Sequence, residues 1–235
     1  MLSPESRTPA ILFSVLLYLP VLEITFRNVL MQLLPEKALY LPQQASLWIA
    51  DPHFGKVSHF RKAGIAVPAR AGEENLRVLK ELLERHQPRE VIFLGDLFHS
   101  GYNAEWPQLL HLLQSYPHTQ FILVKGNHDI LHQWHYQSLT VCKQWHLNDA
   151  FTLTHHPENT EAYNVCGHLH PGVKLQGKGR QQLRLPCFYF GEKGAVLPAF
   201  GQFTGLHFLQ PQPRDKIYVC TGQKVVETPF NEAAH

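Results

Sequence analysis

Three short apolar runs in the first half of the sequence are each followed directly by side chains that bind metal ions. The runs at 47–50, 90–94 and 120–124 have the length and composition of buried strands. They are followed by Asp51 and His53, by Asp96, and by Asn127, His128 and Asp129. Ligands of open α/β sheets bind beyond the carboxyl ends of the strands, so we expect these side chains to meet at one edge of a sheet.

The segments between these runs predict helices. Leucines at helical spacing predict a helix over 73–86 that Pro88 ends, and a second leucine-rich segment predicts a helix that ends before Pro117. The alternation of strand and helix predicts an α/β layered fold with a mainly parallel sheet. After residue 150, short strand-like runs separated by Gly, Pro and Asn predict a β-rich second half that shares one core with the first.

Two further clusters of histidines follow strand-like runs of the second half. They are His155 and His156 after 151–154, and His168 and His170 after 163–166. Residues two apart in an extended segment point to the same side, so His168 and His170 are expected to face one site. A glycine precedes Asp96, Asn127 and His168, and the missing side chain allows close approach of the backbone there.

Composition narrows the class of protein. The chain has 235 residues, 16 histidines and a formal net charge of +2. This charge is too small for a dedicated nucleic-acid-binding domain, so any contact with DNA must be local. The four cysteines contain no Cys-x-x-Cys pair, and we expect them to be reduced thiols of a cytoplasmic protein.

The domain organisation is predicted to be simple. Residues 1–22 form an apolar extension of unknown role, which is too short to span a membrane and has no convincing signal-peptide features. No stable membrane insertion is expected. Residues 23–235 are expected to form a single domain, because no linker long enough to separate two domains interrupts them.

Taken in order, these motifs resemble the calcineurin-like metallophosphoesterases, whose pattern is Asp-x-His, Gly-Asp, Gly-Asn-His-Asp, His and Gly-His-x-His. Segments at 48–56, 59–65, 93–100, 185–187 and 197–205 are similar to the bacterial DNA-ligase-associated subgroup of that family. The resemblance extends over about residues 24–226. It implies a four-layer αββα sandwich with mixed sheets.

The same resemblance implies a binuclear metal centre. The first cation would be held by Asp51, His53, Asp96 and His170. The second would be held by Asp96, Asn127, His155 and His168, with His156 as the alternative to His155. A bridging Asp96 would offset the repulsion between the two cations, and a hydroxide between them would be the nucleophile. Carboxylate, amide and imidazole donors without thiolate suit Mn²⁺, with Zn²⁺ or Fe as alternatives.

Two residues of the third motif are implied to act on the substrate. His128 would donate a hydrogen bond to a phosphoryl oxygen or protonate the leaving oxygen. Asp129 would orient the His128 ring and keep it cationic. The resemblance therefore implies a phosphodiesterase of DNA repair and, by that association, a nuclease with a DNA ligase or a helicase/exonuclease as partner.

Substrate class is left open by the metal ligands. A basic stretch at Lys174, Lys178, Arg180 and Arg184 fits either a track for a phosphate backbone or the solvated rim of a hairpin. Hydrolysis of a small nucleotide or a phosphomonoester is an alternative function. An alternative of another class is a non-catalytic, metal-bound scaffold for a repair ligase or nuclease.

Overall fold

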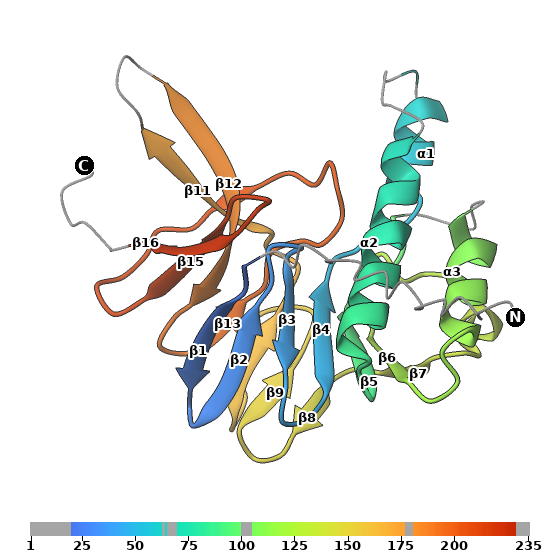
Figure 1. Cartoon of the computed structure of the whole chain (residues 1–235), viewed down its shortest axis with the longest axis horizontal. Helices are drawn as coiled ribbons and strands as arrows, with labels where there is room; N and C mark the ends of the chain where they lie inside the picture. Colours follow the sequence, from blue (N-terminus) through green and yellow to red (C-terminus); the bar gives the residue numbers. More distant parts are fainter. Residues whose placement is uncertain (1–19, 63, 65–69, 100–104, 177–180, 229–235) are drawn as a thin grey trace, which may run out of the picture.

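Two mixed β-sheets pack face to face in the computed structural model of the chain, and helices cover the outer face of one sheet (Figure 1). The structure describes residues 20–62, 64, 70–99, 105–176 and 181–228. The predicted extension at 1–22 lies outside this part of the chain except for its last three residues. The first strand begins at Leu22.

The first sheet has the order β1-β2-β3-β4-β5-β6-β7 in the described residues. Its strands are β1 (Leu22–Phe26), β2 (Val29–Leu33), β3 (Ala38–Leu41), β4 (Ser46–Ala50), β5 (Glu90–Leu94), β6 (Gln120–Val124) and β7 (Thr140–Cys142). β1 to β4 are antiparallel neighbours, whereas β4 to β7 run parallel. The three predicted strands are thus confirmed as β4, β5 and β6, which lie side by side.

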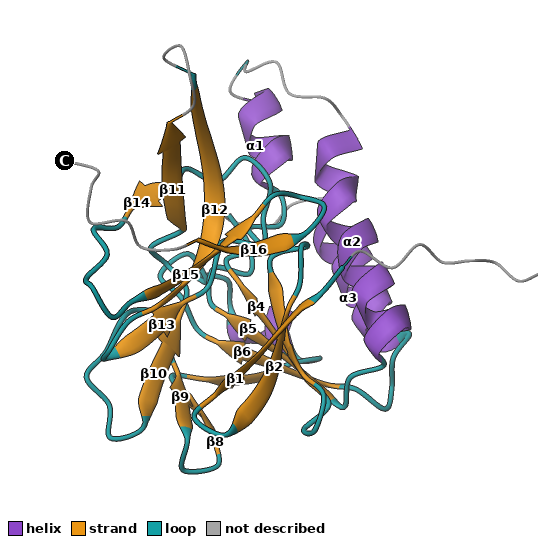
Figure 2. Ribbon diagram, turned by 60° about the vertical axis from the view of Figure 1, so that its left-hand side comes forward, coloured by secondary structure: helices purple, strands orange, loops and turns teal. Residues whose placement is uncertain are grey.

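The helices are α1 (Lys56–Lys62), α2 (Arg70–His86), α3 (Glu105–Gln114) and the 3-10 helix η1 (Gln133–Tyr136). The leucines of α2 and α3 pack with one face of the first sheet in a shared apolar cluster. The two predicted helices are therefore confirmed as α2 and α3. Within the described residues every α-helix precedes residue 115, and they form one outer layer of the sandwich (Figure 2).

The second sheet has the order β14-β11-β12-β13-β10-β9-β8 in the described residues, with β15 paired to β12 and β16 paired to β15. Its strands are β8 (Trp145–Leu147), β9 (Phe151–Leu153), β10 (Tyr163–Cys166), β11 (Pro171–Gln176), β12 (Gln182–Phe190), β13 (Gly194–Val196), β14 (His207–Phe208), β15 (Lys216–Cys220) and β16 (Val225–Thr228). The predicted β-rich second half is confirmed.

The central strands β4 and β5 of the first sheet are buried on both faces, and β4 shows how its sequence achieves this. Trp48 and Ala50 point into the core between the two sheets, whereas Leu47 and Ile49 point to the helices. A strand covered on both faces reads as a continuous apolar run rather than an alternating one. Phe151 and Phe188 of the second sheet fill the core from the other side. The α/β sandwich with mixed sheets is therefore confirmed.

Two further expectations concern cysteines and membranes. All four cysteines are free, and three of them are buried. Among the helices of the described residues, none combines the length and the apolar character that a membrane crossing requires.

Candidate metal centre

The carboxyl ends of strands from both sheets meet at one edge of the sandwich. Ala50, Leu94 and Val124 end β4, β5 and β6 and are register partners, so the loops that follow begin side by side. In the second sheet, β9 and β10 are parallel neighbours, and the loops after them carry the later histidines. The sheets are joined here because Phe200 N donates to Ala50 O over 2.8 Å. The site is therefore built from both halves of the chain.

The residues predicted to hold the first cation lie together. Asp51, His53 and His170 present ligand atoms that are all within 4.8 Å of one another. Asp51 Oδ1 is 3.7 Å from His170 Nε2, and His53 Nε2 is 3.4 Å from the same nitrogen. His53 Nε2 also lies 3.9 Å from Asp96 Oδ2.

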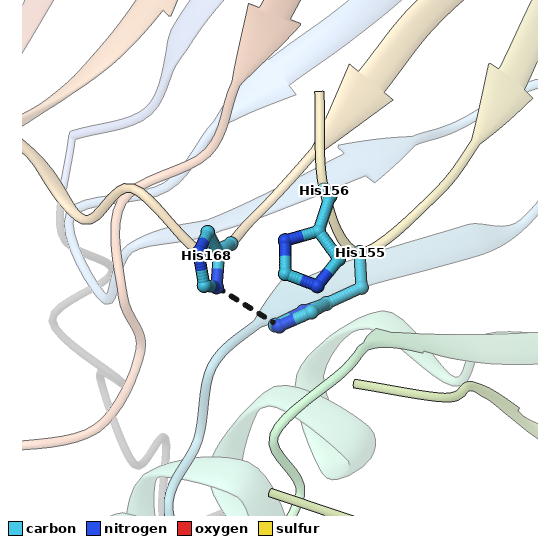
Figure 3. Close-up of side chains that lie close together, drawn as sticks. All are labelled: His155, His156 and His168. Atoms are coloured by element: carbon cyan, nitrogen blue, oxygen red, sulfur yellow. Dashed lines mark hydrogen bonds between the residues drawn. The ribbon is translucent and has the colours of Figure 1, made fainter. Parts of the chain in front are cut away.

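The residues predicted to hold the second cation gather around His155. Its Nε2 lies 3.4 Å from Asp96 Oδ1, 3.0 Å from Asn127 Oδ1 and 3.2 Å from His168 Nδ1 (Figure 3). Asp51, Asp96 and His155 also present ligand atoms within 4.8 Å of one another. The two predicted sets therefore adjoin, and Asp96 contacts members of both.

The surroundings of His155 and His156 differ. His155 is buried, and its Nδ1 donates to Leu94 O over 3.0 Å, which leaves the Nε2 lone pair for a cation. His156 is exposed, and its ring centroid lies 4.0 Å from that of His168 (Figure 3). Its ligand atom still falls within the group formed by His155 and His168. Burial and the tautomer set by Leu94 O favour His155 over His156 as the metal ligand.

Five of the predicted ligands have a left-handed backbone, with φ between 46° and 66°. They are Asp51, His53, Asp96, His168 and His170. Such a conformation costs a non-glycine residue about 1–3 kcal/mol, and it is concentrated at functional sites. The extended conformation expected around His168 and His170 is therefore wrong, because the chain bends at both residues. His170 lies with the residues predicted to hold the first cation, and His168 lies with those predicted to hold the second.

Glycines keep the backbone clear of these side chains. A Cβ at Gly95 would lie 2.0 Å from His155 Nδ1, and one at Gly126 would lie 2.4 Å from Asp96 Oδ1. Likewise, a Cβ at Gly167 would lie 2.5 Å from Asp51 Oδ2. The close backbone approach predicted at the three glycines is confirmed.

Two buried atoms of the predicted ligands have no hydrogen-bond partner in the described residues, Asp51 Oδ1 and His53 Nδ1. A buried carboxylate oxygen without a donor costs free energy, which a bound cation would offset. Burial, and then the positive charge of Lys56, lowers the pKa of His53 to about 2. The ring is therefore neutral, which is the form that binds metal ions. The residues present thus fit divalent cations.

His128 borders the site. Its backbone N donates to Asp96 Oδ1 over 2.9 Å, and its ring centroid lies 5.7 Å from that of His53. The ring is partly exposed beside the predicted ligands.

Asp129 connects two loops of the site. It is 1 % exposed, and its Oδ1 and Oδ2 accept hydrogen bonds from Leu97 N (2.9 Å) and Gly126 N (2.8 Å). Burial raises the pKa of Asp129 to about 6. Within the described residues no hydrogen bond joins Asp129 to the ring of His128. These contacts hold the two loops together, and the expected orientation of the His128 ring by Asp129 stays a prediction.

His99 lies among the histidines of the site, although no motif assigns it a role. Its ring centroid is 5.8 Å from that of His128 and 5.0 Å from that of His59. Burial, and then the charge of Lys56, lowers the pKa of His99 to about 4. Its place three residues after Asp96 is the sequence signal that points to it.

Asn75 of α2 fixes the backbone that carries Asp51 and was not found from the sequence. It is buried, its Nδ2 donates to Pro52 O and its Oδ1 accepts from Gln202 N, both over 3.3 Å. Gly201 N donates to Asp51 O over 3.1 Å. One amide thus connects the loop after β4 to the segment after β13. A helical Asn without a motif gives no signal of this role.

Replacing Asn75 with alanine is expected to weaken metal binding by about 10–100-fold, as the loss of a group that supports a ligand does. The free energy of unfolding should fall by about 1–3 kcal/mol, because two buried backbone groups lose their partner. Calorimetric titration with Mn²⁺ and thermal unfolding measure the two effects. Gln108→Ala on the exposed side of α3 is the matched control. An unchanged metal affinity in Asn75→Ala would contradict the role.

Comparison with known proteins agrees with this geometry. A family model described as calcineurin-like phosphoesterase matches residues 46–223. The chain therefore belongs to the calcineurin-like phosphoesterase family and is a metal-dependent phosphoesterase. Among solved structures, the nuclease MPE of Pseudomonas putida superposes with a TM-score of 0.74 and 28% sequence identity, covering 89% of this chain and 100% of its own. No curated protein matches the chain.

Proposed function

We propose that this phosphoesterase is a phosphodiesterase that cleaves nucleic acid with two divalent cations. The observation that carries the proposal is the chain of contacts from His170 through Asp51 and Asp96 to His155. It supports two adjoining sites rather than one. The similarity to a nuclease supports nucleic acid as the substrate.

Each of the two sets of side chains is assigned to one cation. The first cation is held by Asp51, His53, Asp96 and His170, and the second by Asp96, Asn127, His155 and His168. The donor set suits Mn²⁺, with Zn²⁺ or Fe as alternatives. When bound, two such cations polarise the phosphoryl oxygens and lower the pKa of a coordinated water towards neutrality.

The residues of the chain prepare the site for this chemistry. Asp96 lies between the sets and supplies the negative charge that keeps two cations close. Leu94 O holds His155 in the tautomer that offers Nε2. The partly exposed ring of His128 can donate a hydrogen bond to a phosphoryl or leaving oxygen. Asp129 fixes the loop of Asp96 relative to the loop of Asn127 through its two backbone hydrogen bonds.

A substrate panel with Mn²⁺ tests the proposal. The panel contains bis(p-nitrophenyl) phosphate, p-nitrophenyl phosphate, a cyclic nucleotide and a DNA oligonucleotide. We expect kcat/KM for the diester to exceed that for the monoester by about tenfold or more, and we expect cleavage of the oligonucleotide. EDTA should abolish both activities, and the loaded protein should contain two metal ions per chain.

Other results would select another function. A preference for the monoester with no cleavage of DNA would favour a phosphomonoester or small-nucleotide hydrolase. Two bound metals with no hydrolysis of any ester would favour a non-catalytic scaffold. A role in DNA repair and a ligase or helicase/exonuclease partner stay predictions that rest on sequence likeness. A cytoplasmic location stays a prediction that rests on the cysteine pattern.

A further inference from the structure

A two-stranded arm begins at the metal centre and projects from the sandwich. It consists of β11 and β12, which extend beyond the other strands in both Figure 1 and Figure 2. β11 starts at Pro171, directly after His170. β14 pairs with β11, and His207 N donates to His170 O over 3.0 Å. β11 of the arm and its neighbour β14 therefore both start beside a proposed metal ligand.

The two faces of the arm differ in chemistry. Val173 and Leu185 are register partners on one face, which packs at its base against the cluster of Cys187, Ile217 and Val219. The next pair along the arm, Lys174 and Arg184, lies on the opposite face because successive residues of a strand alternate. Both of these side chains are exposed. One face is therefore apolar and the other is cationic.

The cationic pair is unfavourable for the hairpin by itself. Like charges directly opposite each other in an antiparallel pair are destabilising. Among the described residues, no acidic side chain forms an ion pair with Lys174 or Arg184. An anion outside the chain would offset this repulsion.

An aromatic ring lies on the same face. Phe208 of β14 is the register partner of Gly172 and is 39% exposed. The guanidinium carbon of Arg184 lies 5.7 Å from its ring centroid. Cations that contact phosphates, beside exposed aromatic rings on which bases stack, are the means by which proteins bind single-stranded nucleic acid. An acidic peptide would explain the cations but not the exposed ring.

We propose that Lys174, Arg184 and Phe208 hold a single nucleic-acid strand as it leaves the metal centre. Lys174 is four residues beyond His170, or about 13 Å along a strand, so the phosphate it contacts is not the one at the cations. Phe208 stacks on an unpaired base and Arg184 neutralises the phosphate beside it. This inference rests on the proposed nuclease function and assigns the surface that selects a long substrate over a small ester.

The test measures binding of a fluorescent single-stranded oligonucleotide by anisotropy in EDTA, which prevents cleavage, over a range of salt concentrations. Lys174→Ala/Arg184→Ala is expected to raise Kd about tenfold and to reduce the slope of log K against log salt by about 1.4, because each lost phosphate contact on a single strand contributes about 0.7. Phe208→Ala is expected to raise Kd about tenfold without changing the slope. The increase in Kd caused by Phe208→Ala should be smaller for a blunt duplex, because the bases of a duplex are paired and cannot stack on the ring.

The matched control removes the same charge from the other end of β12. Lys216 pairs with Phe190, the last residue of β12, and Lys193 lies three residues after it; both lysines are exposed. Lys193→Ala/Lys216→Ala should bind the oligonucleotide as the parent protein does. With Mn²⁺, all three variants should hydrolyse bis(p-nitrophenyl) phosphate within about twofold of the parent, because this small ester does not reach the arm.

The outcomes separate this inference from the proposed function. If the arm variants bind the strand as well as the control does, the inference is overturned, and an acidic protein becomes the better occupant of the arm. If the parent protein binds no strand, the inference is also overturned, whatever its activity on the diester. If the parent protein binds the oligonucleotide and the arm variants do not, the inference is supported. This holds even if the parent protein fails to hydrolyse the diester, a result that would contradict the proposed function alone.

Discussion

Replacing Asp96 with asparagine is expected to lower kcat for a phosphodiester by about a thousandfold, equivalent to about 4 kcal/mol of transition-state stabilisation. Asparagine keeps the size of the side chain and an oxygen that can accept from His128 N, whereas it removes the negative charge between the two sets of ligands. The metal content of the purified variant should fall from two ions per chain to one or fewer. Steady-state kinetics and elemental analysis measure these changes.

The control for Asp96→Asn is Asp149→Asn, which removes the same charge from an exposed turn between β8 and β9. Its activity and metal content should equal those of the parent protein. Two tightly bound ions in Asp96→Asn, with activity reduced less than about tenfold, would be incompatible with a carboxylate that bridges them.

Replacing Gly95 with alanine is expected to abolish metal binding and to lower the free energy of unfolding by about 3 kcal/mol or more. Two effects add, since the new Cβ would lie 2.0 Å from His155 Nδ1 and the backbone φ of Gly95 is +77°. Overpacking costs about 1–3 kcal/mol and a left-handed residue about 1–2 kcal/mol. Thermal unfolding with and without Mn²⁺ and hydrolysis of a diester provide the measurements.

Two other glycines of the chain separate these effects. Gly222 has φ of +84° with nothing within 4 Å of an added Cβ, so Gly222→Ala reports the backbone strain alone. Gly205 also has open space and no left-handed φ, so Gly205→Ala should be close to neutral. Both variants should keep full activity. If Gly95→Ala lost no more activity than Gly222→Ala, the close packing of His155 against the strand end would have no functional role.

The parallel strands and the convergence of their ends were predictable because a strand buried on both faces has a distinctive sequence. Leu47 to Ala50 is a continuous apolar run, and Asp51 follows at the point where the run ends. The same reasoning did not identify β1 to β3. These strands are antiparallel, and β1 alternates between partly buried and exposed residues at the edge of its sheet. Local pattern is weak where burial is partial, as in β1 and β2, whereas β3 is fully buried but only four residues long.

Within the site, residue types were predictable and backbone shape was not. The motif containing His168 and His170 was expected to be extended, yet both residues are left-handed, a conformation that local sequence disfavours and tertiary contacts impose. Asp51 Oδ2, for example, accepts from His168 N over 2.8 Å, a contact between residues 117 positions apart. The supporting role of Asn75 cannot be predicted from local sequence for the same reason, because its hydrogen-bond partners are distant in the sequence.

The division of the proposed ligands between two sheets has a consequence for biosynthesis. A chain emerging from the ribosome exposes Asp51, His53, Asp96 and Asn127 well before His155, His168 and His170 exist. In the proposed centre, neither cation can be fully coordinated until the loop after β10, which carries His168 and His170, has been translated and the second sheet has packed against the first. We therefore expect an unfinished or truncated polypeptide to be inert towards phosphoesters, and we expect metal binding to require the complete tertiary structure rather than any single motif.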